Sequence, residues 1–103
     1  MRVIDNSTHQ HIGYLSDISP RGLKLDCQKP LTANINYPLR LDLTSEISNR
    51  PYITLLARAI WSRPDPINPN EYIVGFQIVS ISQAEQEIFQ RIVEKYSTPE
   101  SKW

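Results

Sequence analysis

A chain of 103 residues with 11 basic and 11 acidic side chains, hence no formal net charge, has room for one modest hydrophobic core. The balanced charge argues against binding to duplex nucleic acid or to anionic membranes, because such binding uses a basic excess to displace counterions. A single cysteine excludes an internal disulfide framework. Since no signal-like or membrane-spanning apolar run is visible, we expect a cytoplasmic protein without membrane insertion.

The first part of the sequence predicts short strands joined by turns. Arg2–Asp5 is the first expected strand, Asn6–Gln10 a polar hairpin turn, and Ile12–Ile18 the second strand. The third expected strand, Gly22–Cys27, alternates apolar and polar residues. This alternation puts Cys27 on the apolar face, so we expect a buried thiol rather than a nucleophile or a metal ligand.

The turn between the second and third expected strands has the form Asp-x-Ser-x-x-Gly, with Asp17, Ser19 and Gly22 at its fixed positions. Pro20 sets φ near the value of a type I turn, and Gly22 can take a positive φ without steric cost. The side-chain oxygens of Asp17 and Ser19 are expected to accept hydrogen bonds from the turn backbone. Exposed amides, the Ser19 hydroxyl and the Arg21 guanidinium predict an anion site. A plain hairpin turn is the alternative interpretation.

Two more strands follow in the middle of the chain. Tyr37–Leu43 alternates apolar and polar residues, and so does Ile53–Trp61, where Trp61 would share one face with Ala59. Trp61 is therefore expected to pack in the core or at a barrel mouth rather than to serve as a stacking platform. Ser62–Asn70 contains three prolines and predicts an irregular connection.

The last expected strand is Tyr72–Ile78, and it is followed by a change to helical periodicity. Gly75 leaves a gap on one face of that strand, which predicts a bulge, a packed ring or a ligand there. Ser82 and Glu85 have the spacing of a capping box at the start of an amphipathic helix.

Six short strands before one helix predict a mainly β fold: a small six-stranded antiparallel Greek-key barrel with one C-terminal amphipathic helix. We expect one domain over residues 1–97, with the barrel at 2–80 and the helix at 82–97. Residues 98–103 are expected to form a loose tail.

With the elements in this order, the chain resembles the PilZ domain family, and the resemblance covers nearly the whole chain. The residues that carry it are Asp17-x-Ser19-x-x-Gly22, the strand ending Trp61-Ser62-Arg63, the strand Tyr72-Ile73-Val74-Gly75-Phe76, and Ser82-x-x-Glu85. The resemblance implies a Greek-key barrel without enzymatic activity that acts in bacterial cyclic di-GMP signalling.

The resemblance also implies which residues face the ligand. It assigns the turn to the ligand and the long strand to barrel-surface contacts, and the anion argument adds one arginine. The candidate cyclic di-GMP residues are therefore Asp17, Ser19, Arg21, Gly22, Trp61 and Arg63. The resemblance implies no cofactor besides this ligand and no metal.

One feature of the family is missing from this chain. Receptors of the family carry an Arg-x-x-x-Arg arm just before the first strand, and its arginines clamp phosphates and stack on guanine. Here Arg2 already lies at the first strand and Asn6 follows four residues later. Two interpretations stay open: the arm lies upstream in a longer protein, or the chain is an arm-less member.

The missing contacts set the expected affinity. Each charge-assisted hydrogen bond contributes about 1.5–3 kcal/mol, so losing two arginines costs roughly 3–6 kcal/mol. That is about two to four decades in the dissociation constant. We therefore expect this chain to bind cyclic di-GMP weakly or not at all.

Two classes of function remain open. In the first, the protein is a second-messenger receptor whose ligand orders the arm and changes how the barrel docks on a protein partner. In the second, it is a nucleotide-independent adaptor that acts through protein–protein contacts. A nucleic-acid-binding barrel is disfavoured by the zero net charge and the sparse aromatic residues.

Catalysis and metal binding are not expected. The pair His9-x-His11 resembles half of a metal site but has no third ligand at a plausible spacing, so a polar turn is the expected reading. No nucleophile elbow or glycine-rich oxyanion hole is visible.

Overall fold

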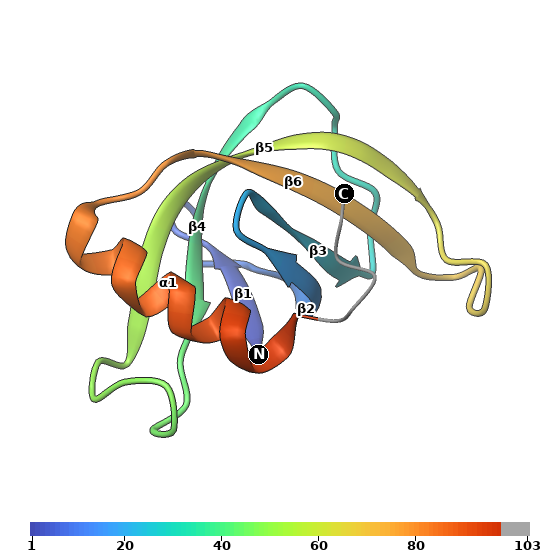
Figure 1. The fold of residues 1–103 in the computed structure, drawn as a ribbon. Helices are drawn as coiled ribbons and strands as arrows, with labels where there is room; N and C mark the ends of the chain where they lie inside the picture. The colour runs from blue at the N-terminus through green and yellow to red at the C-terminus, as the bar shows by residue number, and fades with distance from the viewer. Residues whose placement is uncertain (98–103) are drawn as a thin grey trace.

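Six antiparallel strands close into a barrel, and one helix follows them along the chain (Figure 1). The computed structural model describes residues 1–97. In chain order the elements are β1 (Arg2–Asp5), β2 (His11–Ser19), β3 (Gly22–Cys27), β4 (Asn36–Asp42), β5 (Tyr52–Pro64), β6 (Tyr72–Ser80) and α1 (Gln83–Tyr96). The expected fold class is confirmed. The expected loose tail, 98–103, lies outside the described residues.

The strands are ordered β1-β2-β3-β6-β5-β4 around the barrel, and β4 pairs with β1 to close it. Every pairing is antiparallel. β3 and β4 are consecutive in the chain but not neighbours, so the connection over 28–35 crosses an end of the barrel. The pairing of β3 with β6 brings the β2–β3 turn next to the long β5–β6 pair.

The apolar faces of the strands fill the barrel. Alternation along each strand turns every second side chain inward, which is the pattern expected for a sheet with one wet face. The largest fully buried side chains are Val3, Ile18, Leu23, Leu25, Leu39, Leu41, Ile53, Val74, Phe76, Phe89 and Ile92.

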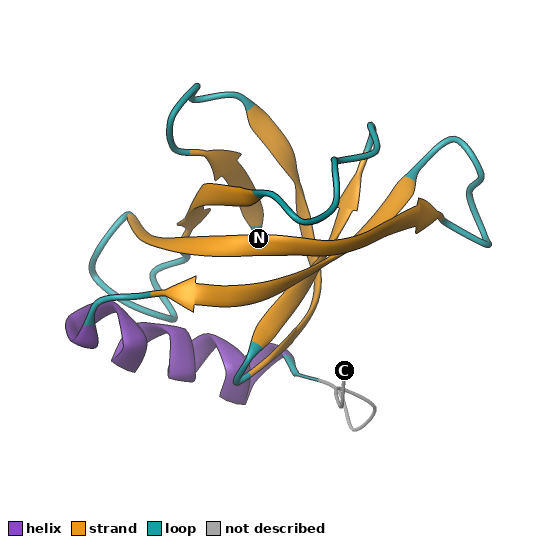
Figure 2. Ribbon diagram, turned by 90° about the horizontal axis from the view of Figure 1, so that it is seen from above, coloured by secondary structure: helices purple, strands orange, loops and turns teal. Residues whose placement is uncertain are grey.

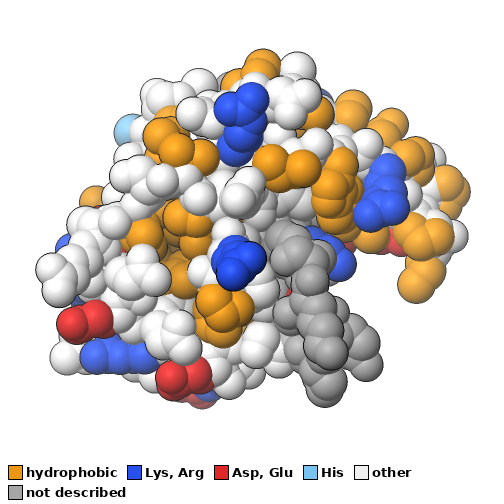
Figure 3. Space-filling view, turned by 45° about the horizontal axis from the view of Figure 1, so that its top comes forward, with side chains coloured by type: hydrophobic (Ala, Val, Ile, Leu, Met, Phe, Trp, Pro, Cys, Tyr) orange, Lys and Arg blue, Asp and Glu red, His pale blue; other side chains and the backbone are white. Residues whose placement is uncertain are grey.

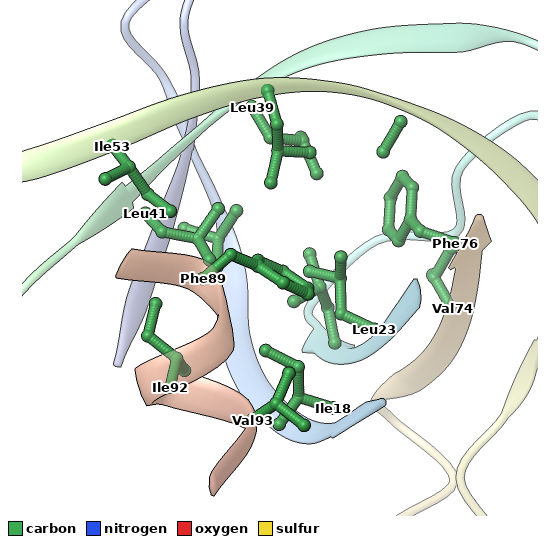
Figure 4. Close-up of a cluster of buried hydrophobic side chains, with 14 of the residues drawn as sticks. Ile18, Leu23, Leu39, Leu41, Ile53, Val74, Phe76, Phe89, Ile92 and Val93 are labelled. Carbon is green, nitrogen blue, oxygen red and sulfur yellow. The ribbon is translucent and has the colours of Figure 1, made fainter. Parts of the chain in front are cut away.

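Helix α1 plugs one end of the barrel (Figure 2). Figure 4 shows Phe89 reaching from the helix toward Leu23 and Leu41. Ile88, Phe89, Ile92 and Val93 are buried, as their helical spacing predicts, whereas Ala84 and Tyr96 at the two ends of the helix are exposed. Among residues 1–97, no helix has the length and apolar character needed to cross a membrane.

The predicted capping box begins the helix, but its carboxylate also reaches the barrel. The Ser82 hydroxyl accepts a hydrogen bond from the Glu85 amide at 3.2 Å and donates to the Glu85 carboxylate at 2.9 Å. The same carboxylate accepts from the amide of Thr54 at 2.6 Å and from its hydroxyl at 3.2 Å. Glu85 therefore fastens the start of α1 to β5.

This contact makes Glu85 a pH-dependent clamp. Partial burial raises the pKa of Glu85, but hydrogen bonds from the Thr54 amide and the Ser82 and Thr54 hydroxyls outweigh it, so the pKa is lowered. A lowered pKa stabilises the fold above the unfolded-state pKa, about 4.3 for Glu, and that stability is lost as the pH falls through the folded-state pKa.

We expect Glu85→Gln to lower the free energy of unfolding at pH 7 by about 1.5–3 kcal/mol, because it removes the charge that these donors stabilise. The deficit should shrink as the pH falls from the unfolded-state pKa through the lowered folded-state pKa, because the wild-type carboxyl then becomes protonated itself. Urea denaturation at a series of pH values measures both effects. Glu87→Gln, at an exposed position of the same helix, is the control. Equal losses in the two variants at pH 7 would contradict the clamp.

The single cysteine lies inside the barrel. Cys27 is 2% exposed and ends β3 on its inward face. Burial raises the pKa of the thiol to about 12, and the charge of Asp26 adds to the effect. The predicted buried thiol is confirmed, and at neutral pH it is protonated.

The two histidines belong to the β1–β2 hairpin. His9 takes a left-handed φ of 62°, and its amide donates to the Asp5 carbonyl at 2.7 Å. The His11 ring makes an edge contact with Tyr14, with ring centroids 4.8 Å apart. Within residues 1–97, no group of three or more His, Cys, Asp and Glu side chains is placed to hold a metal ion.

Candidate functional site

The Asp-x-Ser-x-x-Gly segment forms the tight β2–β3 turn. Ser19 pairs with Gly22, so Pro20 and Arg21 alone connect the strands. Gly22 does not use its tolerance for a positive φ: no glycine has one, and Arg21 does not either. This excludes types I′, II and II′ and fits a type I turn, in which serine, proline and glycine favour the first, second and fourth positions. Gly22 thus begins β3 in extended backbone.

The two acceptors of the motif differ in their surroundings. The Ser19 hydroxyl accepts a hydrogen bond from the Arg21 amide at 3.4 Å, as expected for a turn-stabilising serine. Ser19 is only 4% exposed, and it is the buried polar side chain among residues 1–97. Asp17 accepts instead from the neighbouring Ile18 amide at 2.9 Å and is half-buried. Ser19 therefore holds the turn, whereas Asp17 faces the surface beside it.

A β-bulge changes the face on which Trp61 lies. The β5–β6 register shifts between Ala59 and Trp61, so Ala59 pairs with Phe76 and Trp61 with Gly75. The extra residue, Ile60, turns the next side chain to the outside. The expectation that Trp61 shares an inward face with Ala59 is therefore wrong, and the tryptophan lies on the outer wall of the barrel.

β5 is also longer than predicted. It continues to Pro64 rather than ending at Trp61, because Arg63 pairs with Ile73 on the neighbouring strand. The first three residues of the predicted irregular connection, 62–64, thus belong to a strand. As a consequence Trp61 and Arg63, two residues apart, lie on the same outer face.

The Trp61 ring rests on Gly75. A Cβ atom at Gly75 would lie 2.4 Å from the Cε2 atom of Trp61, so only glycine admits the ring here. Of the three explanations open for the gap at Gly75, the packed ring is confirmed. The Arg63 guanidinium carbon lies 4.1 Å from the centroid of the Trp61 ring, a cation–π contact.

Trp61 separates two surface hollows. One has a volume of about 290 Å³ and, besides Trp61, is lined by Arg21, Gly22, Ile60, Gly75, Phe76 and Gln77. The other has a volume of about 390 Å³ and, besides Trp61, is lined by Ser16, Asp17, Lys24, Arg63, Pro66 and Ile73. The fold thus brings four of the six predicted residues, Asp17, Arg21, Gly22 and Arg63, around the ring of a fifth, Trp61, and buried Ser19 lines neither hollow.

The sequence interpretation missed Lys24. Lys24 pairs with Asp17 on one side and with Gly75 on the other, so it lies on the outer face between the turn and Trp61. The alternation that turns Leu25 inward already turned Lys24 outward, but it did not reveal which strand would lie beside β3. Arg58 pairs with Gln77 and lines neither hollow.

The charges around Trp61 are few and separate. Arg21 lines one hollow, and Lys24, Arg63 and Asp17 line the other. Figure 3 shows basic side chains set singly among hydrophobic ones, rather than a continuous basic patch. This arrangement suits a ligand that combines a small number of negative charges with apolar planar groups.

We expect Gly75→Ala to destabilise the fold by about 1–3 kcal/mol, because the added methyl group must displace the indole ring. The indole Nε1–H signal of Trp61 should shift at the same time. Denaturation and two-dimensional NMR measure the two effects. In a Trp61→Ala background the methyl group meets no ring, so Gly75→Ala should cost much less there. Equal costs in both backgrounds would show that the ring contact is not the cause.

Comparison with known proteins adds one match. The family model described as "PilZ domain" matches residues 3–95, a span that contains every candidate site residue. No curated protein matches the chain, and no solved structure does.

Proposed function

Because this chain belongs to the PilZ domain family, a family of non-catalytic cyclic di-GMP receptor-type modules, we propose that it binds cyclic di-GMP around Trp61. The turn residues Asp17, Arg21 and Gly22 lie on one side of the ligand in this proposal, and Arg63 lies on the other. The protein would then act in the cytoplasm, where it would read the ligand and pass the signal to a protein partner.

One observation carries the proposal: Trp61 is shared by the two hollows that contain the turn and Arg63. Cyclic di-GMP has two phosphodiester charges and two planar bases. A cation in each hollow can pair with a phosphodiester, and the Trp61 ring with the Arg63 guanidinium over it offers a planar surface for a base. The hollows, about 290 and 390 Å³, have the size of small-molecule sites.

Each side chain has a chemical role in this proposal. The Arg21 guanidinium can donate two parallel hydrogen bonds to a phosphate. The Asp17 carboxylate can accept from the N–H donors on the edge of a guanine base. The contribution of Ser19 is indirect. Its hydroxyl accepts a hydrogen bond from the Arg21 amide, and the residue is only 4% exposed.

An amide-resolved NMR titration with cyclic di-GMP tests the proposal. We expect saturable shifts at Asp17, Arg21, Gly22 and the Trp61 indole, at ligand concentrations from high micromolar to millimolar. Arg21→Ala should remove most of the response. Arg58→Ala, which deletes an arginine outside both hollows, should leave it unchanged. No saturable shifts up to several millimolar would overturn the proposal.

The adaptor function is favoured by a different observation. Ile35 and Ile60 are 44% and 41% exposed, and the Ala59 amide donates to the Ile35 carbonyl at 3.0 Å, so the two isoleucines lie on adjoining backbone segments. An adaptor would use such apolar side chains for a protein contact. The adaptor function predicts that cyclic di-GMP leaves the NMR spectrum of the chain unchanged.

A further inference from the structure

We propose that the guanidinium of Arg63, rather than the Trp61 ring, is the surface on which a base of the ligand stacks. This inference rests on the proposed cyclic di-GMP site and adds how that site recognises a planar base. Three layers make the surface: the backbone of β6 at Gly75, the indole of Trp61, and the guanidinium of Arg63.

The inner layer fixes the ring. Trp61 pairs with Gly75 across β5 and β6, and an added Cβ atom at Gly75 would lie 2.4–2.6 Å from the Cε2, Cζ2 and Nε1 atoms of the indole. The ring therefore lies directly against the strand backbone. One face of the indole is used by this contact and is closed to a ligand.

The outer layer covers the other face. The guanidinium carbon of Arg63 lies 4.1 Å from the ring centroid, which is stacking distance. Because β6 occupies the inner face, the guanidinium lies over the outer one. A base that approaches from solvent meets Arg63 before it meets Trp61.

A guanidinium plane held in this way is suited to a base. Arginine stacks on aromatic planes, whereas the ammonium of lysine is a compact, strongly hydrated point charge. Nucleobases stack on arginine planes as well as on aromatic rings. Arg63 is exposed, so its outer side is available, and it lines the hollow of about 390 Å³ with Asp17 and Lys24. A ligand whose base stacks on Arg63 would thus also lie within the hollow that contains the charged side chains of Asp17 and Lys24.

The strand sets the position of this layer. Trp61 and Arg63 are in register with Gly75 and Ile73, and both follow the bulge at Ile60. Groups held by paired strands keep their geometry better than groups on loops. Trp61 is accordingly a positioning residue in this proposal: its ring holds the Arg63 guanidinium in place and does not itself contact the base.

The test compares Arg63→Lys, which keeps the charge and loses the plane, with Arg63→Ala and with the control Arg58→Ala. Equilibrium dialysis with labelled cyclic di-GMP at a concentration far below saturation gives a bound fraction proportional to the association constant. Since stacking contributes about 1–3 kcal/mol per base, we expect Arg63→Lys to bind roughly ten-fold less ligand than the wild type. Arg58→Ala should stay within about two-fold of the wild type.

The outcomes separate this inference from the proposed function. If the wild type binds and Arg63→Lys binds equally well, charge alone is needed and the stacking surface is overturned while the cyclic di-GMP site stands. Tighter binding by Arg63→Ala would mean that the guanidinium blocks Trp61, which also overturns the inference. If the wild type does not bind at all, both fall. Replacing Trp103 with phenylalanine leaves Trp61 as the single tryptophan, so its fluorescence checks that the ring is still in place.

Discussion

An Arg-x-x-x-Arg segment placed directly ahead of Met1 is expected to lower the dissociation constant for cyclic di-GMP by about two to four decades. Two added arginines supply charge-assisted hydrogen bonds worth about 1.5–3 kcal/mol each. The direction of β1 along β2 would bring the added arginines toward the candidate site. Arg2 pairs with Tyr14, and the Leu15 amide donates to the Met1 carbonyl at 2.8 Å. A segment added ahead of Met1 would therefore start alongside β2 in the direction of Asp17.

Isothermal titration calorimetry of the extended and unextended chains measures this gain. An Ala-x-x-x-Ala segment of the same length controls for added chain, and Lys-x-x-x-Lys controls for charge without the planar fork. Both charged forms should lose affinity with salt more steeply than the alanine form. A gain below about ten-fold, or an equal gain from the alanine segment, would contradict the two-contact estimate.

Replacing Phe89 with alanine should have the largest effect on stability. Phe89 is 1% exposed, and it carries the helix into the end of the barrel beside Leu23 and Leu41 (Figure 4). Truncation of such a buried phenylalanine costs about 3–5 kcal/mol, from the lost burial and from the cavity left behind. Small domains have only about 5–15 kcal/mol in total, so we expect a large fall in the urea midpoint.

Tyr96→Ala is the matched control, because it removes another aromatic ring from the same helix. Tyr96 is 37% exposed, and we expect a loss of no more than about 0.5–1 kcal/mol. The comparison separates the stability lost by removing a buried ring from the end of the barrel from the stability lost by truncating any aromatic residue of α1. Similar losses in the two variants would show that the buried face of the helix contributes little.

Local patterns predicted most of the fold. The period-two alternation around Leu23 and Leu41 places both side chains inside the barrel, and Ser82 begins the helix where its spacing to Glu85 indicates. These signals are local, because each depends on a few neighbouring residues. The second role of Glu85 was not predictable, since its partner Thr54 lies 31 residues away.

The errors have local physical causes as well. A single bulged residue, Ile60, reverses the face of everything that follows it in β5, and alternation counted along the sequence does not reveal a bulge. The tolerance of Gly22 for a positive φ is not used, because the fourth position of a type I turn does not require one.

Motifs in the sequence named the candidate residues, but not how these residues lie relative to one another. The turn motif and Arg63 were identified along the chain, and the gap at Gly75 was noticed without its occupant. That Trp61 fills this gap follows only from the β5–β6 register, and the place of Lys24 follows only from strand order. Motifs name candidate residues, whereas the mutual placement of those residues depends on long-range strand pairing.

The buried thiol also gives the protein a natural reporter of its own opening motions. Cys27 is the single cysteine of the chain, it is 2% exposed, and its pKa is raised to about 12. An alkylating reagent reacts with the thiolate, so it can modify Cys27 only while the surrounding strands are apart. The rate of alkylation therefore records how often the barrel opens, with and without a ligand, and no label has to be introduced.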